Sequence, residues 1–238
     1  MRGVSLVRRG AAALALALGV LAAPAAVTAG VMFVDEGGDR TLLSTGRVKI
    51  APASPDAPTF VLDMARGRMW VANRARRTFW EGTIDEYCAG VTGSIAGGAA
   101  RPVRVTVERT AHTETIAGWP TRKYRVLADG VLHEELWLTS ETSVARALDA
   151  GRAADTVGRM MGCMLAVPPG PGVESSAEYR KLYAQGWPLR SVYYGAGGAS
   201  GQSSIVTAGS RDIAEQEFAP PSGYRRAPFA EVVGGGAR

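Results

Sequence analysis

Residues 59–81 read TFVLDMARGRMWVANRARRTFWE, and this stretch decides the fold. Three short segments, 59–63, 69–73 and 78–81, are rich in apolar, β-branched and aromatic residues, as strands are. Tight, arginine-rich turns separate these segments at 65–68 and 74–77. Because connections this short join antiparallel neighbours, the stretch predicts a three-stranded meander.

More strand patterns follow on the C-terminal side. Val103, Val105 and Val107 alternate with polar residues and predict a half-buried strand. Asp129-Gly130 lies between two alternating segments and predicts a hairpin, since both central residues of a type I′ turn need positive φ. The segments predicted as strands of this hairpin and of the later sheet are 122–127, 132–138, 189–194 and 203–208.

Helical patterns interrupt the strands. Residues 83–86 resemble a capping box and predict a helical turn or two, followed by a glycine-rich loop at 90–100 that we expect to be mobile. Apolar residues at spacings of three and four predict a long helix over 144–165, and 175–185 predicts a shorter one. The order of elements indicates an α+β domain with a curved antiparallel sheet, whose concave face the helices would cover.

Residues 1–29 have the three-part form of a secretory signal peptide. An unbroken apolar run from Ala11 to Ala23 is too short to cross a bilayer comfortably and ends at Pro24, which disfavours an uncleaved anchor. Small residues at Val27 and Ala29 favour cleavage after Ala29, with Ala25 as the second choice. The basic residues ahead of the run are Arg2, Arg8 and Arg9.

Removal of that segment changes the charge balance. The whole chain is formally +5, but three arginines leave with the signal, so the mature chain is close to +2. A nearly neutral surface argues against nucleic acid as a partner. Residues 30–233 then form one domain with a substantial core, and the glycine-rich tail 234–238 is expected to be disordered.

Two cysteines remain, Cys88 and Cys163. In an oxidising compartment an isolated pair most simply forms one disulfide, and the alternative is two independent buried thiols. Neither cysteine belongs to a C-x-x-C pair, which argues against a redox enzyme.

No residue cluster predicts catalysis. His112 and His133 lack ligand partners at metal-site spacing, and we expect both side chains to face solvent. The adjacent acidic pair Glu134 and Glu135 should diverge on a strand as part of a solvated surface. A serine-nucleophile motif is also missing, so the sequence predicts no enzyme, no metal and no cofactor.

The aromatic residues and methionines are the residues that suggest a function. Core packing explains each of them singly. Together, aromatics on a curved sheet that face a methionine-rich helix would line an adaptable apolar cavity, because methionine repacks easily. The residues predicted to line this cavity are Phe60, Leu62, Trp70, Phe79, Tyr124, Trp137, Met160, Met161 and Met164.

Three motifs, in matching order, cover most of residues 31–229. They are the meander above, Thr113–Trp119 with Lys123–Val126 and Glu135–Trp137, and Phe218–Tyr224. The set resembles an exported bacterial family of unknown function that is similar in fold to the periplasmic lipoprotein carriers LolA and LolB. The chain departs from that family at Ala111, where glycine is expected, and at Thr121, where cysteine is common. The resemblance implies a half-barrel sheet with a helical cover and no catalytic residues.

These observations predict a monomeric, non-enzymatic protein of a Gram-negative periplasm. Its predicted role is to bind a lipid, an acyl chain or another apolar molecule between sheet and helices. The alternative is an envelope structural or stress module that binds another protein through a sheet edge or the convex face. A hydrolase is the third class, and a buried carboxylate with a raised pKa beside a polar pocket would favour it.

Overall fold

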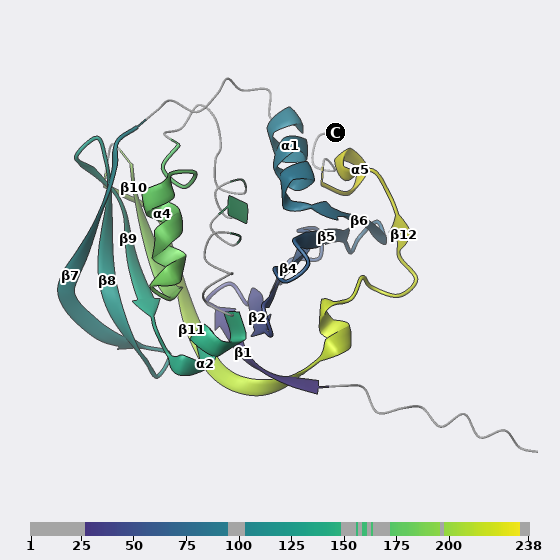
Figure 1. The fold of residues 1–238 in the computed structure, drawn as a ribbon, viewed down its shortest axis with the longest axis horizontal. Helices are drawn as coiled ribbons and strands as arrows, with labels where there is room; N and C mark the ends of the chain where they lie inside the picture. Colours follow the sequence, from purple (N-terminus) through teal and green to yellow (C-terminus); the bar gives the residue numbers. More distant parts are fainter. Residues whose placement is uncertain are drawn as a thin grey trace, which may run out of the picture.

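The computed structural model describes residues 27–94, 103–148, 156, 159–160, 163, 172–195 and 198–233. Twelve strands form one sheet in the order β12-β6-β5-β4-β3-β2-β1-β11-β10-β9-β8-β7 (Figure 1). Neighbours are antiparallel except β12 and β6, which are parallel. The strands are β1 (Val27–Asp35), β2 (Arg40–Ser44), β3 (Arg47–Ala51), β4 (Thr59–Asp63), β5 (Arg68–Asn73), β6 (Thr78–Thr83), β7 (Val105–Ile116), β8 (Trp119–Ala128), β9 (Val131–Thr139), β10 (Trp187–Gly195), β11 (Gly198–Ala214) and β12 (Arg225–Arg226).

The helices are short and lie between the strands. They are α1 (Ile84–Ser94), α2 (Thr142–Leu148), α4 (Ala177–Arg180) and α5 (Phe229–Val233), with 3₁₀ turns η1 (Lys181–Ala184) and η2 (Glu215–Phe218). Helix α2 packs against β1, β2 and β3, whereas α4 packs against β7, and α1 and α5 pack against β6. Within the described ranges no helix is long and apolar enough to span a membrane.

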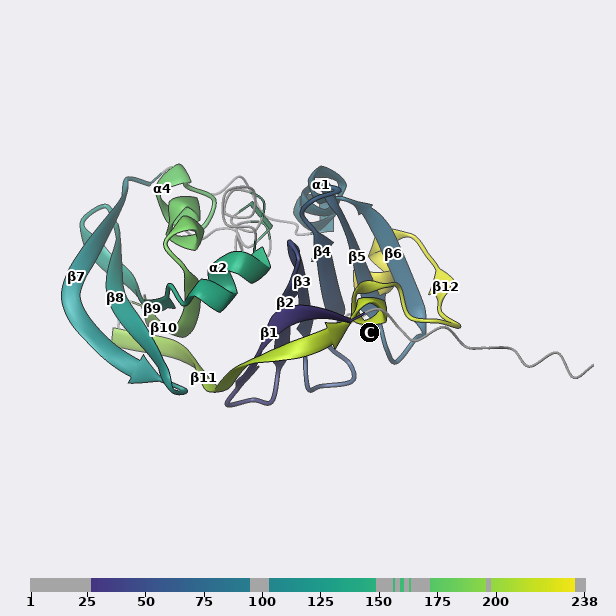
Figure 2. The same ribbon diagram turned by 60° about the horizontal axis from the view of Figure 1, so that its bottom comes forward.

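Strand β11 bends the sheet. Its first half, up to Ser204, pairs with β10, and its second half, from Ile205, pairs with β1. The two ends of one long strand therefore belong to two arms, β7–β10 and β1–β6, which face each other across the bend (Figure 2). The result is a single curved, unclosed sheet with a few helices, in agreement with the predicted α+β domain with a curved antiparallel sheet.

Local sequence explains the turns and the first helix. The predicted meander forms as β4, β5 and β6. In the predicted hairpin between β8 and β9, Asp129 and Gly130 both have positive φ, 51° and 83°. At the start of α1 the backbone N–H of Glu86 donates to Thr83 Oγ1 (3.2 Å), and the Glu86 carboxylate accepts from the Thr83 N–H (2.7 Å). This capping box confirms the predicted helix start.

Several predicted boundaries were wrong. Helix α1 extends to Ser94, so the first half of the loop predicted at 90–100 is helical, and residues 95–102 lie outside the described part. The sequence also gave no prediction for β1–β3, whose inward-facing Val31, Phe33 and Leu43 are fully buried. Of the helix predicted over 144–165, α2 is described as a continuous segment, and beyond it Met160 and Cys163 are helical. The signal up to residue 26 and the tail 234–238 lie outside the described residues.

The predicted disulfide is present. Cys88 on α1 is bonded to Cys163, 75 residues further along the chain. On the same helix, Asp85 forms an ion pair with Arg159. The segment that carries Met160 is therefore tied to α1 at two points.

Replacement of both Cys88 and Cys163 by serine should lower the free energy of unfolding by about 4 kcal/mol, because the unfolded chain loses a closed loop of this length. Urea denaturation measures this change. A reducing agent should destabilise the natural chain by a similar amount and leave the double variant unchanged. Equal stability of the natural chain with and without reductant would contradict the prediction.

The start of β1 bears on where the signal is cleaved. Thr28 Oγ1 lies 2.6 Å from the hydroxyl of buried Ser44, and that hydroxyl donates to the carbonyl of Ala29. Cleavage after Ala29 would remove this end of the strand, whereas cleavage after Ala25 leaves it whole. We therefore expect the exported protein to begin at Ala26, which intact-mass measurement of the secreted chain will check. A mass that corresponds to a start at residue 30 would contradict this expectation.

Candidate functional site

Strand alternation divides the predicted cavity residues between the two faces of the sheet. Leu62 pairs with Met69, and both belong to the large apolar core beneath the helices, which we call the inner face. Phe60 packs against the same core. Trp70 and Phe79 instead belong to a smaller cluster on the opposite, outer face, which also contains Phe218.

The remaining predicted residues are Tyr124, Trp137 and three methionines. Tyr124 and Met160 lie in the inner core, 6% and 1% exposed, while Met161 and Met164 lie outside the described residues. Trp137 follows Leu136 on β9, and its ring lies near the Lys123 ammonium and the Arg190 guanidinium, 4.8 and 5.3 Å from the ring centroid. The structure therefore gathers five of the predicted side chains, Phe60, Leu62, Tyr124, Trp137 and Met160, in the large core.

The inner face contains a hollow of about 220 Å³ near the bend. Leu189 and Ile205 contribute apolar side chains from β10 and β11, and Trp187 stacks on Phe33 with ring centroids 6.2 Å apart. Serine and tyrosine hydroxyls supply polar contacts, and Asp35, Asp39 and Arg190 add charged residues to the lining. Residues that line this hollow include Thr41, Ile50, Tyr183, Trp187, Leu189, Ser191, Tyr193, Ser203 and Ile205.

A β-bulge places a carboxyl group beneath α4. Val126 pairs with Glu134 and Leu127 with Leu132, so His133 is an extra residue on β9. Glu134 is fully buried, and neither of its carboxyl oxygens has a hydrogen-bond partner of normal geometry among the described residues. Burial raises the pKa of Glu134 to about 7, although the nearby hydroxyls of Tyr179 and Tyr193 oppose this shift.

The bulge also turns His133 inward. Its Nε2 lies 3.1 Å from Glu174 Oε1, and this hydrogen bond raises the pKa of His133 above its ordinary value. Burial raises the pKa of Tyr179, Tyr183 and Tyr193, and the Glu134 carboxylate adds to the shift of each. The cluster is therefore a buried acid surrounded by neutral phenols.

Two predictions about these residues were wrong. His133 is not a solvent-facing strand residue, because its side chain is 19% exposed and bonded to Glu174. Glu134 is not part of a solvated surface either. The Glu135 side chain is only 12% exposed, but its carboxylate is paired with Lys123 at 2.6 Å and accepts from the Tyr194 hydroxyl. The signal that could have revealed this was the bulge, which alternation alone does not show.

The outer face carries larger hollows, on both sides of the segment 215–224. This segment, which we call the strap, crosses the outer face of the meander. Trp70 Nε1 donates to the Phe218 carbonyl (2.9 Å), and Phe218 is 6% exposed. Arg47 donates two hydrogen bonds to Glu215 (2.9 and 2.7 Å), and its guanidinium lies 4.6 Å from the Phe218 ring centroid.

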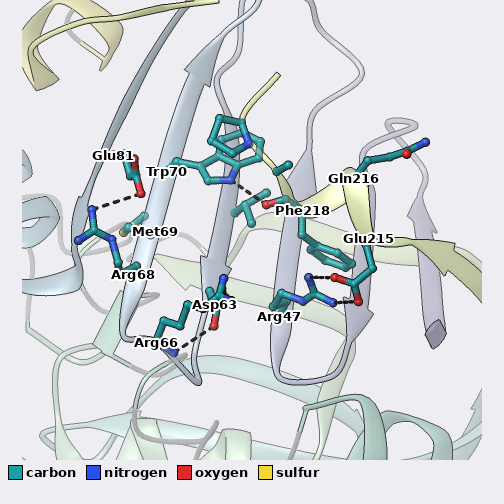
Figure 3. A pocket seen from close by; sticks show the side chains of 13 residues that line it. Arg47, Asp63, Arg66, Arg68, Met69, Trp70, Glu81, Glu215, Gln216 and Phe218 are labelled. Atoms are coloured by element: carbon teal, nitrogen blue, oxygen red, sulfur yellow. Dashed lines mark hydrogen bonds and ion pairs between the residues drawn. The ribbon is translucent and has the colours of Figure 1, made fainter. Parts of the chain in front are cut away.

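Figure 3 shows the hollow on one side of the strap, with a volume of about 420 Å³. Basic and acidic side chains are paired around its rim. Arg47 pairs with Glu215, Arg68 with Glu81 (3.2 Å), and Arg66 with Asp63 (3.4 Å). Because each basic group in this rim has an acidic partner, the hollow is electrically balanced.

A second and a third hollow, of about 720 and 310 Å³, adjoin each other on the other side of the strap. They share Arg40, Lys49, Ala51 and Glu217, so they form one continuous groove. Trp70 lies in the wall of both the first and the second hollow. The sequence analysis missed this groove, because the residues that build it come from segments far apart in the chain.

A metal site is not evident. No group of three or more histidine, cysteine, aspartate or glutamate side chains in the described ranges is arranged to hold an ion.

No protein-family model and no curated protein matches the chain. Among solved structures, MucB superposes with a TM-score of 0.34 and 12% identity, over 84% of this chain and 58% of MucB. An uncharacterized conserved protein from Thermus thermophilus superposes with a TM-score of 0.41 and 10% identity, over 84% of this chain and 88% of that protein. PNGF-II superposes with a TM-score of 0.42 and 10% identity, over 86% of this chain and 31% of PNGF-II. This chain thus spans less than two thirds of MucB and about a third of PNGF-II, and such values leave its function to be argued from its own residues.

The Glu134 carboxyl predicts a pH-dependent stability. A glutamate in the unfolded chain titrates near 4.5, so between about pH 4.5 and 7 the folded protein keeps a proton that the unfolded chain releases. The free energy of unfolding should therefore fall as pH rises through this window, by roughly 3 kcal/mol. Glu134→Gln keeps the shape without the titration and should flatten the fall, as measured by urea denaturation across the window.

Glu135→Gln is the matched control. The pKa of Glu135 is lowered, with Lys123 and Tyr194 holding the charged form, so its contribution is present above about pH 4.5 and is lost on the acid side. This control should keep the natural fall between pH 4.5 and 7. An unchanged fall in Glu134→Gln would contradict the assignment.

Proposed function

We propose that this chain is a non-enzymatic binding protein that works outside the cytoplasm and holds an apolar molecule, such as an acyl chain, on the inner face of its bent sheet. The observation that carries the proposal is the inner hollow at the bend. Apolar side chains from both arms meet there, with Ile50 from β3 and Leu189 from β10.

The size of the hollow limits the ligand. Small-molecule sites usually enclose about 300–1,000 Å³, and this hollow measures about 220 Å³. It suits a short chain or one end of a longer chain rather than a whole lipid. The hydroxyls of Ser191, Tyr193 and Ser203 in its wall would hydrogen-bond a polar end of the same molecule.

Export is supported by two independent features. The N-terminal segment has the form of a secretory signal, and the Cys88–Cys163 disulfide is of a kind that persists in oxidising compartments.

The arrangement of polar groups supports binding over catalysis. Among the described residues, the rings of His112 and His133 face the carboxylates of Glu114 and Glu174, and neither ring is hydrogen-bonded to a hydroxyl or thiol that it could activate. Glu134 has the raised pKa of a general acid, but its fully buried side chain does not reach a substrate in this arrangement.

A fluorescent fatty acid tests the proposal. The natural mature chain should bind it, and Ser203→Phe should weaken binding by about tenfold or more, because the ring occupies the hollow. Val206→Phe is the matched control. Val206 follows Ile205 on β11, and its side chain is exposed and does not line the hollow, so this variant should bind as the natural chain does. Absence of probe binding by the natural chain, or equal weakening in both variants, would overturn the proposal.

A further inference from the structure

The groove formed by the second and third outer hollows has unbalanced charge. Its lining carries four basic residues, Arg40, Lys49, Arg74 and Arg211, against two acidic ones, Asp212 and Glu217. Lys49 and Glu217 pair with each other at 2.6 Å. The groove therefore keeps an excess of positive charge, in contrast to the balanced hollow of Figure 3.

Three guanidinium groups carry that excess. Arg74 donates to the carbonyl of Pro52 (3.0 Å) and Arg211 contacts the sulfur of Met32 (3.1 Å). In the described part of the chain, no carboxylate lies within ion-pair distance of Arg40, Arg74 or Arg211. All three are exposed, so each could receive an anionic group with little desolvation of its own.

The three groups follow one another along the groove. Arg74 lines the second hollow, Arg211 lines the third, and Arg40 lines both. A single compact anion would contact one of them, whereas an extended chain with repeated negative charges would contact all three in turn.

The floor and walls favour a peptide over an acyl chain. Apolar surface comes from Trp70, Ala72 and Tyr224 in the second hollow and from residues such as Met32, Leu42 and Ile213 in the third, and the polar side chains of Gln216 and Ser222 lie beside the former. An acyl chain needs a continuous apolar lining, which the arginines interrupt. A peptide backbone can instead use such side chains as hydrogen-bond partners.

We propose that this groove is a docking site for an extended acidic segment of a partner protein, separate from the apolar hollow on the inner face. The strap forms one wall of the site, held by the Trp70–Phe218 hydrogen bond and the Lys49–Glu217 ion pair. The carboxylates of the partner bind Arg74, Arg40 and Arg211 in sequence.

Fluorescence anisotropy with a labelled peptide of alternating glutamate and alanine tests the site. The natural chain should bind this peptide, should not bind a twin with glutamine in place of glutamate, and should release it at high salt. Joint replacement of Arg40, Arg74 and Arg211 by alanine should weaken binding by about tenfold or more. Joint replacement of the same residues by lysine keeps the charge and should retain most of the affinity.

The matched control replaces Arg104, Arg109 and Arg146 by alanine. These exposed arginines lie outside the groove, and their loss changes the net charge by the same amount. The control should bind the acidic peptide as the natural chain does. Equal weakening in the two alanine variants would reduce the effect to net charge and overturn the proposal.

Two further probes separate other anions from the peptide. Inorganic phosphate and phosphatidylglycerol vesicles should bind weakly, and the alanine variant should not change that weak binding. Loss of vesicle binding in the variant with no change for the peptide would assign the groove to a lipid headgroup and overturn the proposal. The fluorescent fatty acid should bind the groove variant normally, so failure of one site is distinguishable from failure of the other.

Discussion

The pairing of β1 with β11 is the constraint on which the rest of the structure depends. It joins the first described strand to the last long one, with Val31 opposite Ser210. Gly30 of β1 has no room for a side chain, because a Cβ there would lie 2.4 Å from the Leu43 carbonyl oxygen of β2 and 2.5 Å from Ile213 Cδ1 of β11. Without this pairing, β1–β6 and β7–β10 would be two separate sheets, and neither the bend nor the inner hollow would exist.

The same arrangement gives the two faces of the sheet different chemistry. The inner face is lined mainly by apolar side chains, and its buried acid, Glu134, is kept largely protonated in mildly acidic conditions by its surroundings. The outer face of the meander is covered by one strap, which leaves hollows lined by exposed arginines. Because β-strand side chains alternate, a one-residue shift in register would exchange these surfaces, so register and function are linked.

The features that were predicted correctly are those that depend on residues close together in the sequence or on a unique pair. The meander, the Asp129-Gly130 hairpin, the capping box at Thr83 and the disulfide are all present, because each depends on neighbouring residues or on a unique pair. The site was only partly predicted. Alternation already implied that Leu62 and Trp70 face opposite sides, since a tight turn pairs Val61 with Trp70, yet the predicted cavity grouped them. The bulge at His133 and the strap at 215–224 depend on tertiary packing, which periodicity does not encode.

The two faces share strands, so a ligand on the inner face is physically connected to the outer groove. A ligand in the inner hollow touches Ile205 on β11, and the same strand carries Arg211 to the outer groove. Adjacent residues on a strand are rigidly connected through its ladder of hydrogen bonds, but a strand that pairs with β10 in one half and β1 in the other can change its twist at the junction. The two surfaces are also adjacent on β2 and β3, where Thr41 and Ile50 line the inner hollow and Arg40 and Lys49 line the outer groove. The junction at Ser204 and Ile205, where the partner of β11 changes, is therefore one of three strand connections between them.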